Sequence, residues 1–100
     1  MTERAHVTVV DSTEKSQFEA LDDSGVVAGF IDYHPSSEDP DVLVFEHIAV
    51  DDAFEGQGVG SSLVAGAMEQ VRAADKKVRP DCPFVARWLD KHPDFADLRV

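Results

Sequence analysis

The sequence predicts a single α+β domain over residues 1–100, with a mainly antiparallel sheet packed on helices. Three observations lead to this fold class. The first half alternates apolar or β-branched runs with turn residues and carries no helical periodicity. Apolar residues then recur every three or four positions from residue 59 to 71, which is typical of an amphipathic helix. A short strand and a second helix follow, so the expected order is four strands, helix, strand, helix.

Polar turns separate the four strands expected in the first half. The first run is rich in β-branched residues, and the second alternates polar residues with Phe18 and Ala20. The expected strands cover residues 6–10, 15–21, 26–33 and 42–50. The last of these is the most apolar, so we expect it to lie centrally in the sheet.

The second half begins with a glycine-rich loop, residues 51–60, and a helix expected over residues 58–74. A helix cannot continue into a proline, so residues 76–80 are expected to form a short strand. Proline is favoured at the first helical position, which makes Pro83 the start of a second helix with Asp81 or Cys82 as its cap. The expected buried side of this helix consists of Phe84, Val85, Trp88 and Leu89. The helix is expected to end at His92-Pro93, and the tail to dock through Phe95 and Leu98.

Composition restricts the class of function. With 43% hydrophobic and 29% charged residues the chain is globular in character. A net charge of −11 argues against binding to nucleic acid or to an anionic membrane. There is no apolar run of membrane-spanning length, no signal-like N-terminal segment, and only one cysteine, Cys82. We therefore expect a cytoplasmic protein, a monomer or weak dimer, without disulfides. The histidines and Cys82 have no metal-ligand spacing, so no metal is expected.

The charge is unevenly distributed. Residues 1–50 contain eleven acidic and two basic residues, whereas residues 51–100 contain nine acidic and seven basic residues. The basic residues of the second half include Arg72, Lys76, Lys77, Arg79, Arg87 and Lys91. They are interpreted either as a solvated surface or as a local positive field for an anionic cofactor. The overall acidity would suit a cationic acceptor such as an amine.

The stretch from Phe45 to Met68 contains the principal functional signal: a strand, a glycine turn and a helix start. Glycine lets a large anion approach the backbone closely, and the first N–H groups of a helix lack helical partners. Together these features predict a phosphate cradle, although a tight connection without any ligand has similar spacing. Two nucleotide motifs are excluded: Ser61 follows Gly60 where a P-loop requires lysine, and Ser61 also replaces the third Rossmann glycine.

The loop resembles the Q/R-x-x-G-x-G/A motif that follows the fourth strand in the GNAT superfamily of acetyl-coenzyme A-dependent N-acetyltransferases. Gly58 and Gly60 match the motif, and Val59 between them is usual. Glu55 departs from it, because the family has Gln or Arg there. An anionic side chain next to a pyrophosphate is unfavourable unless it points into solvent, so this departure bears on cofactor affinity.

Further motifs resemble a compact GNAT-like group that lacks the usual N-terminal helices. They are Phe45-Glu46-His47, Pro80-Asp81-Cys82-Pro83-Phe84-Val85 and His92-Pro93-Asp94-Phe95. The resemblance covers residues 42–98 in register, with Ile48 where the group usually has threonine. It implies that the fourth and fifth strands splay apart and that pantetheine pairs with the fourth strand between them. The cofactor-binding residues implied are Ile48, Ala49, Val50, Gly56, Gln57, Gly58, Val59, Gly60 and Ser61.

Three residues are candidates for acetyl-transfer chemistry: Glu46, His47 and Cys82. His47 can act as a base near neutral pH, and Glu46 can act through a water, but each is otherwise a surface group or a satisfied polar group of the sheet. As strand neighbours they point to opposite faces unless a bulge intervenes, so only one is expected to face the cofactor. Cys82 is either a small buried hydrophobe or a thiol activated by a helix N-terminus.

The resulting hypothesis is an acetyl-coenzyme A-binding acyltransferase that moves an acetyl group to an amine. The acceptor is either a small molecule or a lysine-containing protein. The alternative is a noncatalytic coenzyme A-binding or small interaction domain. Glu55 and the short chain favour this alternative slightly, whereas the combined Phe-x-His and Pro-x-Cys motifs favour the enzyme.

Overall fold

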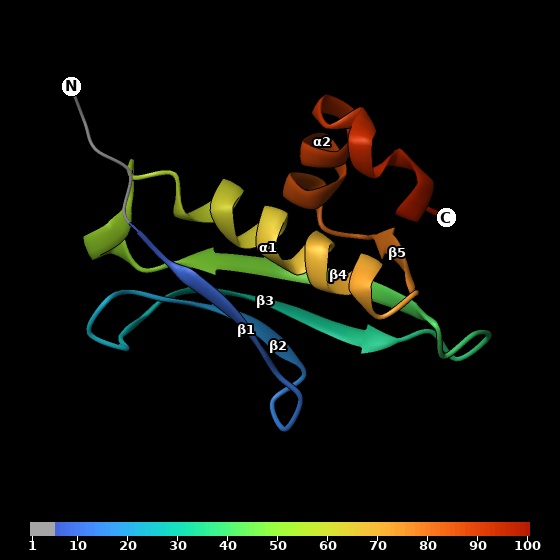
Figure 1. Cartoon of the computed structure of the whole chain (residues 1–100), viewed down its shortest axis with the longest axis horizontal. Coiled ribbons are helices and arrows are strands. Elements are labelled where there is room, and N and C mark those ends of the chain that lie inside the picture. The colour runs from blue at the N-terminus through green and yellow to red at the C-terminus, as the bar shows by residue number, and fades with distance from the viewer. Residues whose placement is uncertain (1–5) are drawn as a thin grey trace.

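The computed structural model describes residues 6–100, which form a five-stranded sheet with helix α1 lying along one face (Figure 1). The strands are β1 (Thr8–Ser12), β2 (Gln17–Leu21), β3 (Val27–Pro35), β4 (Val42–Val50) and β5 (Lys77–Pro80). The helices are α1 (Val59–Ala73) and α2 (Pro83–Lys91), with short 3₁₀ helices η1 (Asp52–Phe54) and η2 (Pro93–Leu98). The predicted α+β class and element order are confirmed.

The strands lie in the sheet in their order along the chain, β1-β2-β3-β4-β5. The first four form an antiparallel meander, whereas β5 pairs parallel to β4. A parallel pair needs a crossover, and the segment containing α1 supplies it. Strand β4 is an interior strand, as its apolar sequence suggests, although β3 occupies the middle of the sheet.

The hydrophobic core lies between the sheet and α1. Its largest fully buried side chains include Phe18, Ile31 and Phe45 from the sheet and Leu63 and Met68 from α1. The stripe predicted at three- and four-residue spacing is the buried side of α1. The helix also approaches β1 closely, since a Cβ at Gly66 would lie 2.5 Å from a methyl group of Val9.

The strand ends differ from the prediction in the first hairpin. Strand β1 covers residues 8–12 instead of 6–10, because Asp11 pairs with Phe18 and Ser12 with Gln17. Lys15 lies in the turn with Ser16, whose φ of 53° places it in the left-handed region. The pairing of the two strands therefore begins at Gln17, two residues later than expected.

The C-terminal region agrees with the prediction except for Phe84. Cys82 is the N-cap of α2 and Pro83 its first residue, and His92 Nδ1–H donates to Trp88 O at 2.6 Å at the other end. Trp88 is buried, but Phe84 is 38% exposed and does not belong to the buried side. None of the helices in residues 6–100 has the length and apolar character needed to cross a membrane.

Candidate cofactor and acetyl-transfer site

Strands β4 and β5 separate halfway along β4. Their pairing begins at Val42 and Lys77 and ends at Phe45 and Pro80. The Cys82 N–H then donates to the carbonyl oxygen of Phe45 at 2.9 Å as the chain turns into α2. Strand β4 continues five residues further, to Val50, so this part of its edge has no neighbouring strand among the described residues (Figure 1).

Two residues on this open edge present unpaired backbone groups. The Asp51 N–H, directly after β4, donates to the carbonyl oxygen of Ala28 in β3 at 2.8 Å. Hydrogen-bonding positions alternate along an antiparallel strand, so Ala49 also faces β3. By the same alternation, Ile48 and Val50 direct their N–H and C=O groups to the open edge. Of the three predicted strand residues, Ile48 and Val50 therefore have backbone groups available to a ligand. The backbone groups of Ala49 pair with β3 within the sheet.

The glycine loop leads into α1 with an uncapped N-terminus. Gly56 and Gly58 have φ values of 78° and 76°, in the left-handed region that favours glycine. Gly58 is the N-cap without a side-chain hydrogen bond, and the first bond of the helix runs from Ser62 N–H to Gly58 O at 3.1 Å. The N–H groups of Val59, Gly60 and Ser61 therefore have no helical partners. Gln57 has a structural contact, because its Nε2 donates to the carbonyl oxygen of residue 53 at 3.2 Å.

A hollow of about 440 Å³ lies between the end of β4, the glycine loop and the start of α2. Its walls include Val50, Phe54 and Phe84, and the loop backbone forms its rim. Gly60 lies close to the Phe84 ring, since a Cβ there would lie 3.0 Å from it and the ring would have to shift slightly. Glu55 lines the same hollow and is solvent-exposed. The uncapped N–H groups fit an anionic group, with the Glu55 carboxylate as an opposing charge.

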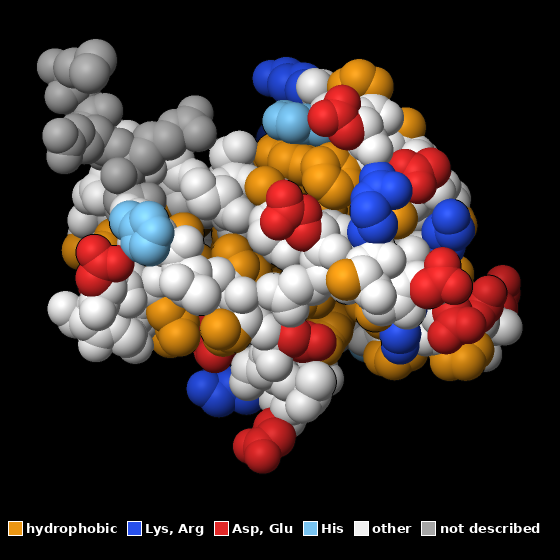
Figure 2. All heavy atoms as spheres, viewed as in Figure 1, with side chains coloured by type: hydrophobic (Ala, Val, Ile, Leu, Met, Phe, Trp, Pro, Cys, Tyr) orange, Lys and Arg blue, Asp and Glu red, His pale blue; other side chains and the backbone are white. Residues whose placement is uncertain are grey.

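Three of the six basic residues predicted as a positive field are already engaged, two by carboxylates and one by a backbone carbonyl. Arg72 donates twice to Asp97, and this hydrogen bonding raises the pKa of the guanidinium and lowers the pKa of the carboxyl group. Arg79 pairs in the same way with Asp81. Lys77 Nζ donates to Asp97 O at 2.9 Å. Figure 2 shows these signs intermixed over the C-terminal part of the molecule.

The basic residues close to the glycine loop are instead on α2. Arg87 and Lys91 line a second hollow of about 290 Å³ that shares Ser61 and Phe84 with the first. Within residues 6–100 neither side chain forms an ion pair. Positive charge beside the loop therefore comes from one face of α2.

Glu46 and His47 lie on the same face of the sheet, because β4 contains a bulge, the one feature expected to override their opposite orientation. Strand β4 has a bulge at Glu46, since Asp32 pairs with His47 and the next residue of β3 pairs with Phe45. Glu46 Oε1 lies 3.4 Å from His34 Nδ1, and the His47 ring centroid is 6.3 Å from that of Phe30.

His34, Asp32 and Phe30 alternate along β3 and share one face, opposite the face of Ile31 that is buried against α1. Both Glu46 and His47 are therefore exposed on the face of the sheet that no helix covers (Figure 1). Sequence reasoning missed His34 as the partner of Glu46, because nothing in the spacing reveals the bulge.

Cys82 is adjacent to this region through its backbone, but its side chain belongs to the core. The residue is 4% exposed and lies within the hydrophobic cluster. Among the described residues its thiol forms no hydrogen bond with Glu46 or His47. The Cys82 backbone is therefore bonded to the end of the β4–β5 pairing, but its thiol does not pair with the imidazole of His47. No group of three or more His, Cys, Asp or Glu in residues 6–100 could hold a metal ion.

A family model described as GCN5-related N-acetyl-transferase matches residues 17–98, most of the chain. The chain belongs to this family. It is accordingly an acetyltransferase of the class that uses acetyl-coenzyme A, as the sequence predicts. The finer assignment to the compact group with the Phe-x-His and Pro-x-Cys motifs stays a prediction.

Solved structures support the GNAT fold. A GCN5-like putative N-acetyltransferase from Staphylococcus aureus superposes with a TM-score of 0.66 at 24% identity, over 97% of this chain and 89% of that one. The GNAT family N-acetyltransferase YhbS from Escherichia coli, in complex with CoA, superposes with a TM-score of 0.59 at 19% identity. The match covers 94% of this chain and 74% of YhbS. A putative phosphinothricin N-acetyltransferase superposes with a TM-score of 0.59 at 21% identity, and the match covers 81% of this chain and 53% of that one. No curated protein matches the chain.

Proposed function

We propose that this GNAT domain binds acetyl-coenzyme A between the glycine loop and the open edge of β4, and acetylates an amine on the uncovered face of the sheet. The supporting observation is the separation of β4 from β5 at Phe45, directly beside an uncapped helix start. When bound, the thioester supplies an activated acetyl group. The chain supplies binding groups for the phosphates, for the amide-bearing arm and for the acceptor amine.

The phosphates would bind at the N–H groups of the loop, residues 56–61. Gly56 and Gly58 have left-handed backbone conformations and no side chains, so a phosphate can approach the loop backbone closely. The positive end of the α1 dipole also favours an anion at this position. Arg87 and Lys91 add positive charge next to Ser61, which offsets the Glu55 carboxylate. The pantetheine amides would pair with the free backbone groups of β4.

The acceptor amine would approach from the face that carries Glu46 and His47. An ammonium group must lose a proton before its nitrogen can attack a carbonyl carbon, so a base is required within reach. His47 could take that proton directly, and Glu46 could take it through a water. His34, 3.4 Å from Glu46, acts in this scheme as a positioning residue. The protein's net charge of −11 favours a cationic acceptor, such as a small amine or a lysine side chain.

Burial of Cys82 favours direct transfer from the thioester to the amine. A thiol that is 4% exposed and surrounded by core side chains must move before it can accept an acetyl group. Its backbone has a clearer role, because the Cys82 N–H ends the β4–β5 pairing and its carbonyl accepts from Ala86 N–H to begin α2.

The test combines a binding measurement with a turnover assay. Calorimetry with acetyl-coenzyme A should give one site per chain, and adding spermidine or a lysine-rich peptide should accelerate release of free thiol. Binding without any acceleration over a panel of amines would indicate a noncatalytic coenzyme A-binding module. Absence of binding would remove the proposed site altogether.

A further inference from the structure

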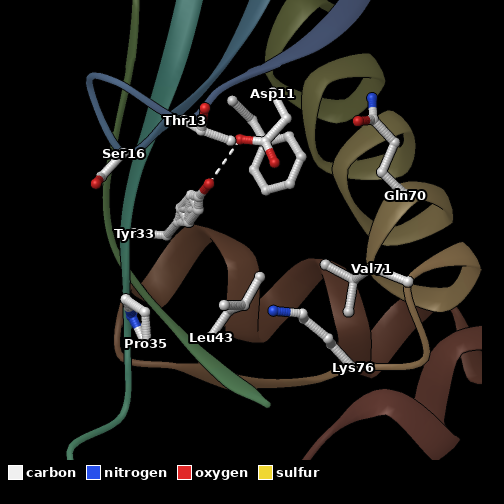
Figure 3. Close-up of a pocket in the computed structure, with 11 residues that line it drawn as sticks. Asp11, Thr13, Ser16, Tyr33, Pro35, Leu43, Gln70, Val71 and Lys76 are labelled. Atoms are coloured by element: carbon white, nitrogen blue, oxygen red, sulfur yellow. Dashed lines mark hydrogen bonds between the residues drawn. The ribbon is translucent and has the colours of Figure 1, made fainter. Parts of the chain in front are cut away.

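A second pocket lies far along α1 from the glycine loop. It has a volume of about 400 Å³ and lies between the β1–β2 hairpin, the end of β3, the start of β4 and the last turns of α1 (Figure 3). None of its lining residues also lines the hollow beside the glycine loop. Nothing in the proposed acetyl transfer uses this pocket, so its chemistry needs a separate explanation.

One wall of the pocket accepts hydrogen bonds and carries a negative charge. The Tyr33 hydroxyl donates to Asp11 Oδ1 at 2.6 Å. Burial raises the pKa of the Tyr33 hydroxyl, and the hydrogen bond to the Asp11 carboxylate and its charge add to this effect. The phenol therefore stays protonated and directs its hydrogen at Asp11. The second carboxylate oxygen and the phenol lone pairs remain available, and all of them are acceptors suited to an ammonium group.

The other wall carries a positive charge. Lys76 follows α1 and is half-buried, and its Nζ extends into the pocket beside Leu43 (Figure 3). Within residues 6–100 this ammonium has no ion-pair or hydrogen-bond partner, whereas Arg72, Lys77 and Arg79 all do. Each half-buried charge benefits from an opposite charge or acceptor, and a bound anion would provide one for Lys76.

Apolar side chains form the floor between the two charged walls, although the polar residues Thr13, Ser16 and Gln70 also line the pocket. Phe18, Leu43 and Val71 line it and are 2%, 8% and 1% exposed. Opposite charges on either side of an apolar floor are complementary to a small molecule that carries both signs on an apolar body. A plain amine would leave Lys76 unpaired, and a plain carboxylate would gain nothing from Asp11.

We propose that this pocket binds a small zwitterion, an amino acid with an apolar side chain. Its ammonium group contacts Asp11 and Tyr33, its carboxylate contacts Lys76, and its side chain packs on Phe18 and Val71. The site is separate from the proposed acetyl-coenzyme A site and does not depend on it. The pocket gives the acetyltransferase a second small-molecule site at the opposite end of α1.

Three ligands with the same hydrocarbon body test the proposal: L-leucine, isoamylamine, which lacks the carboxylate, and 4-methylpentanoate, which lacks the amine. Titrations of the isotope-labelled full chain, followed by NMR, should shift resonances of Tyr33, Val71 and Lys76 with L-leucine. Leucine should bind about tenfold more tightly than either analogue, since each missing charge removes one charge-assisted hydrogen bond. Equal dissociation constants for the three ligands, or no shift at these residues, would overturn the proposal.

Variants assign the two charges. Lys76→Gln should reduce leucine affinity to that of isoamylamine and leave isoamylamine binding unchanged. Asp11→Asn should reduce leucine affinity to that of 4-methylpentanoate. Lys91→Gln removes a lysine near the glycine loop instead and should leave leucine binding unaltered. A Lys76→Gln variant that remains folded by circular dichroism and still binds leucine as tightly as the wild type would show that Lys76 does not bind the carboxylate of leucine. In that case the proposal is wrong.

Discussion

The Cys82 N–H donates to the carbonyl oxygen of Phe45 at 2.9 Å, and this bond marks the end of the pairing between β4 and β5. Beyond it, Ile48 and Val50 present backbone groups to an open edge that leads directly to the glycine loop. The proposed cofactor site follows from this one separation, because strand edge, loop and helix start then share a single hollow.

Gly58→Val should abolish binding of acetyl-coenzyme A. The substitution introduces a branched side chain at a φ of 76° on the rim of the hollow, where the proposed phosphates approach. Gly25→Val is the matched control, because Gly25 has a φ of 83° in a turn where an added Cβ would have no heavy atom within 4 Å. Both variants should lose about 1–3 kcal/mol of stability in urea unfolding. Calorimetry showing unchanged affinity in Gly58→Val would exclude the loop as the phosphate site.

Glu55→Gln should tighten binding of acetyl-coenzyme A. The exposed carboxylate lines the hollow and repels an anionic ligand, and removing one exposed charge should change the dissociation constant by about twofold to fivefold. Glu69→Gln, an exposed charge change on α1 that does not line this hollow, should have no effect. Weaker binding by Glu55→Gln would mean that the carboxylate stabilises the loop.

Arg87→Gln should weaken coenzyme A binding, and the loss should be greater at low salt than at high salt. Arg87 lines the hollow that adjoins the loop, and no ion pair within the described residues offsets its charge. Arg72→Gln serves as the control, since Arg72 is engaged by Asp97 and should leave affinity unchanged. The reverse order of effects would mean that the positive field comes from the end of α1 and not from α2.

Only part of the fold and of the candidate site can be predicted from the sequence. Periodicity and turn residues predict the element order, because burial of an apolar stripe and glycine at positive φ leave direct traces in the sequence. Contacts between residues that are distant in the sequence produce no comparable local pattern. The engagement of Arg72 by Asp97, the bulge that brings Glu46 and His47 to one face, and the exposure of Phe84 all depend on tertiary contacts. The pocket between Asp11, Tyr33 and Lys76 could not be predicted for the same reason, since four separate segments of the chain form it.

His47→Gln should reduce turnover more than Glu46→Gln does, and it should remove the acidic limb of the pH–rate profile. An imidazole must be neutral to accept a proton, so a histidine base makes the rate fall as the pH is lowered. His34→Gln is the informative companion, because a positioning role for Glu46 predicts a smaller loss of rate with the limb retained. Survival of the acidic limb in His47→Gln would assign the base to Glu46 or to a water that it orients.

Cys82→Ala should keep acetyl-transfer activity and lose about 1 kcal/mol of stability, because the thiol is a buried core group. Intact mass measurement of the wild type with acetyl-coenzyme A, in the absence of an acceptor, should show no acetyl adduct. The chain has a single cysteine, so an adduct on sulfur is unambiguous. An adduct that amine discharges, and that Cys82→Ala does not form, would instead establish a covalent relay through this thiol.

Backbone amide hydrogen exchange, measured residue by residue with and without coenzyme A, tests the central claim most directly. The Ile48 and Val50 amides lie on the open edge and should exchange rapidly in the free protein and slowly in the complex, together with those of Val59, Gly60 and Ser61. The Ala49 amide faces β3 and should be protected in both states. Coenzyme A binding that leaves exchange at Ile48 and Val50 unchanged would contradict the proposed site.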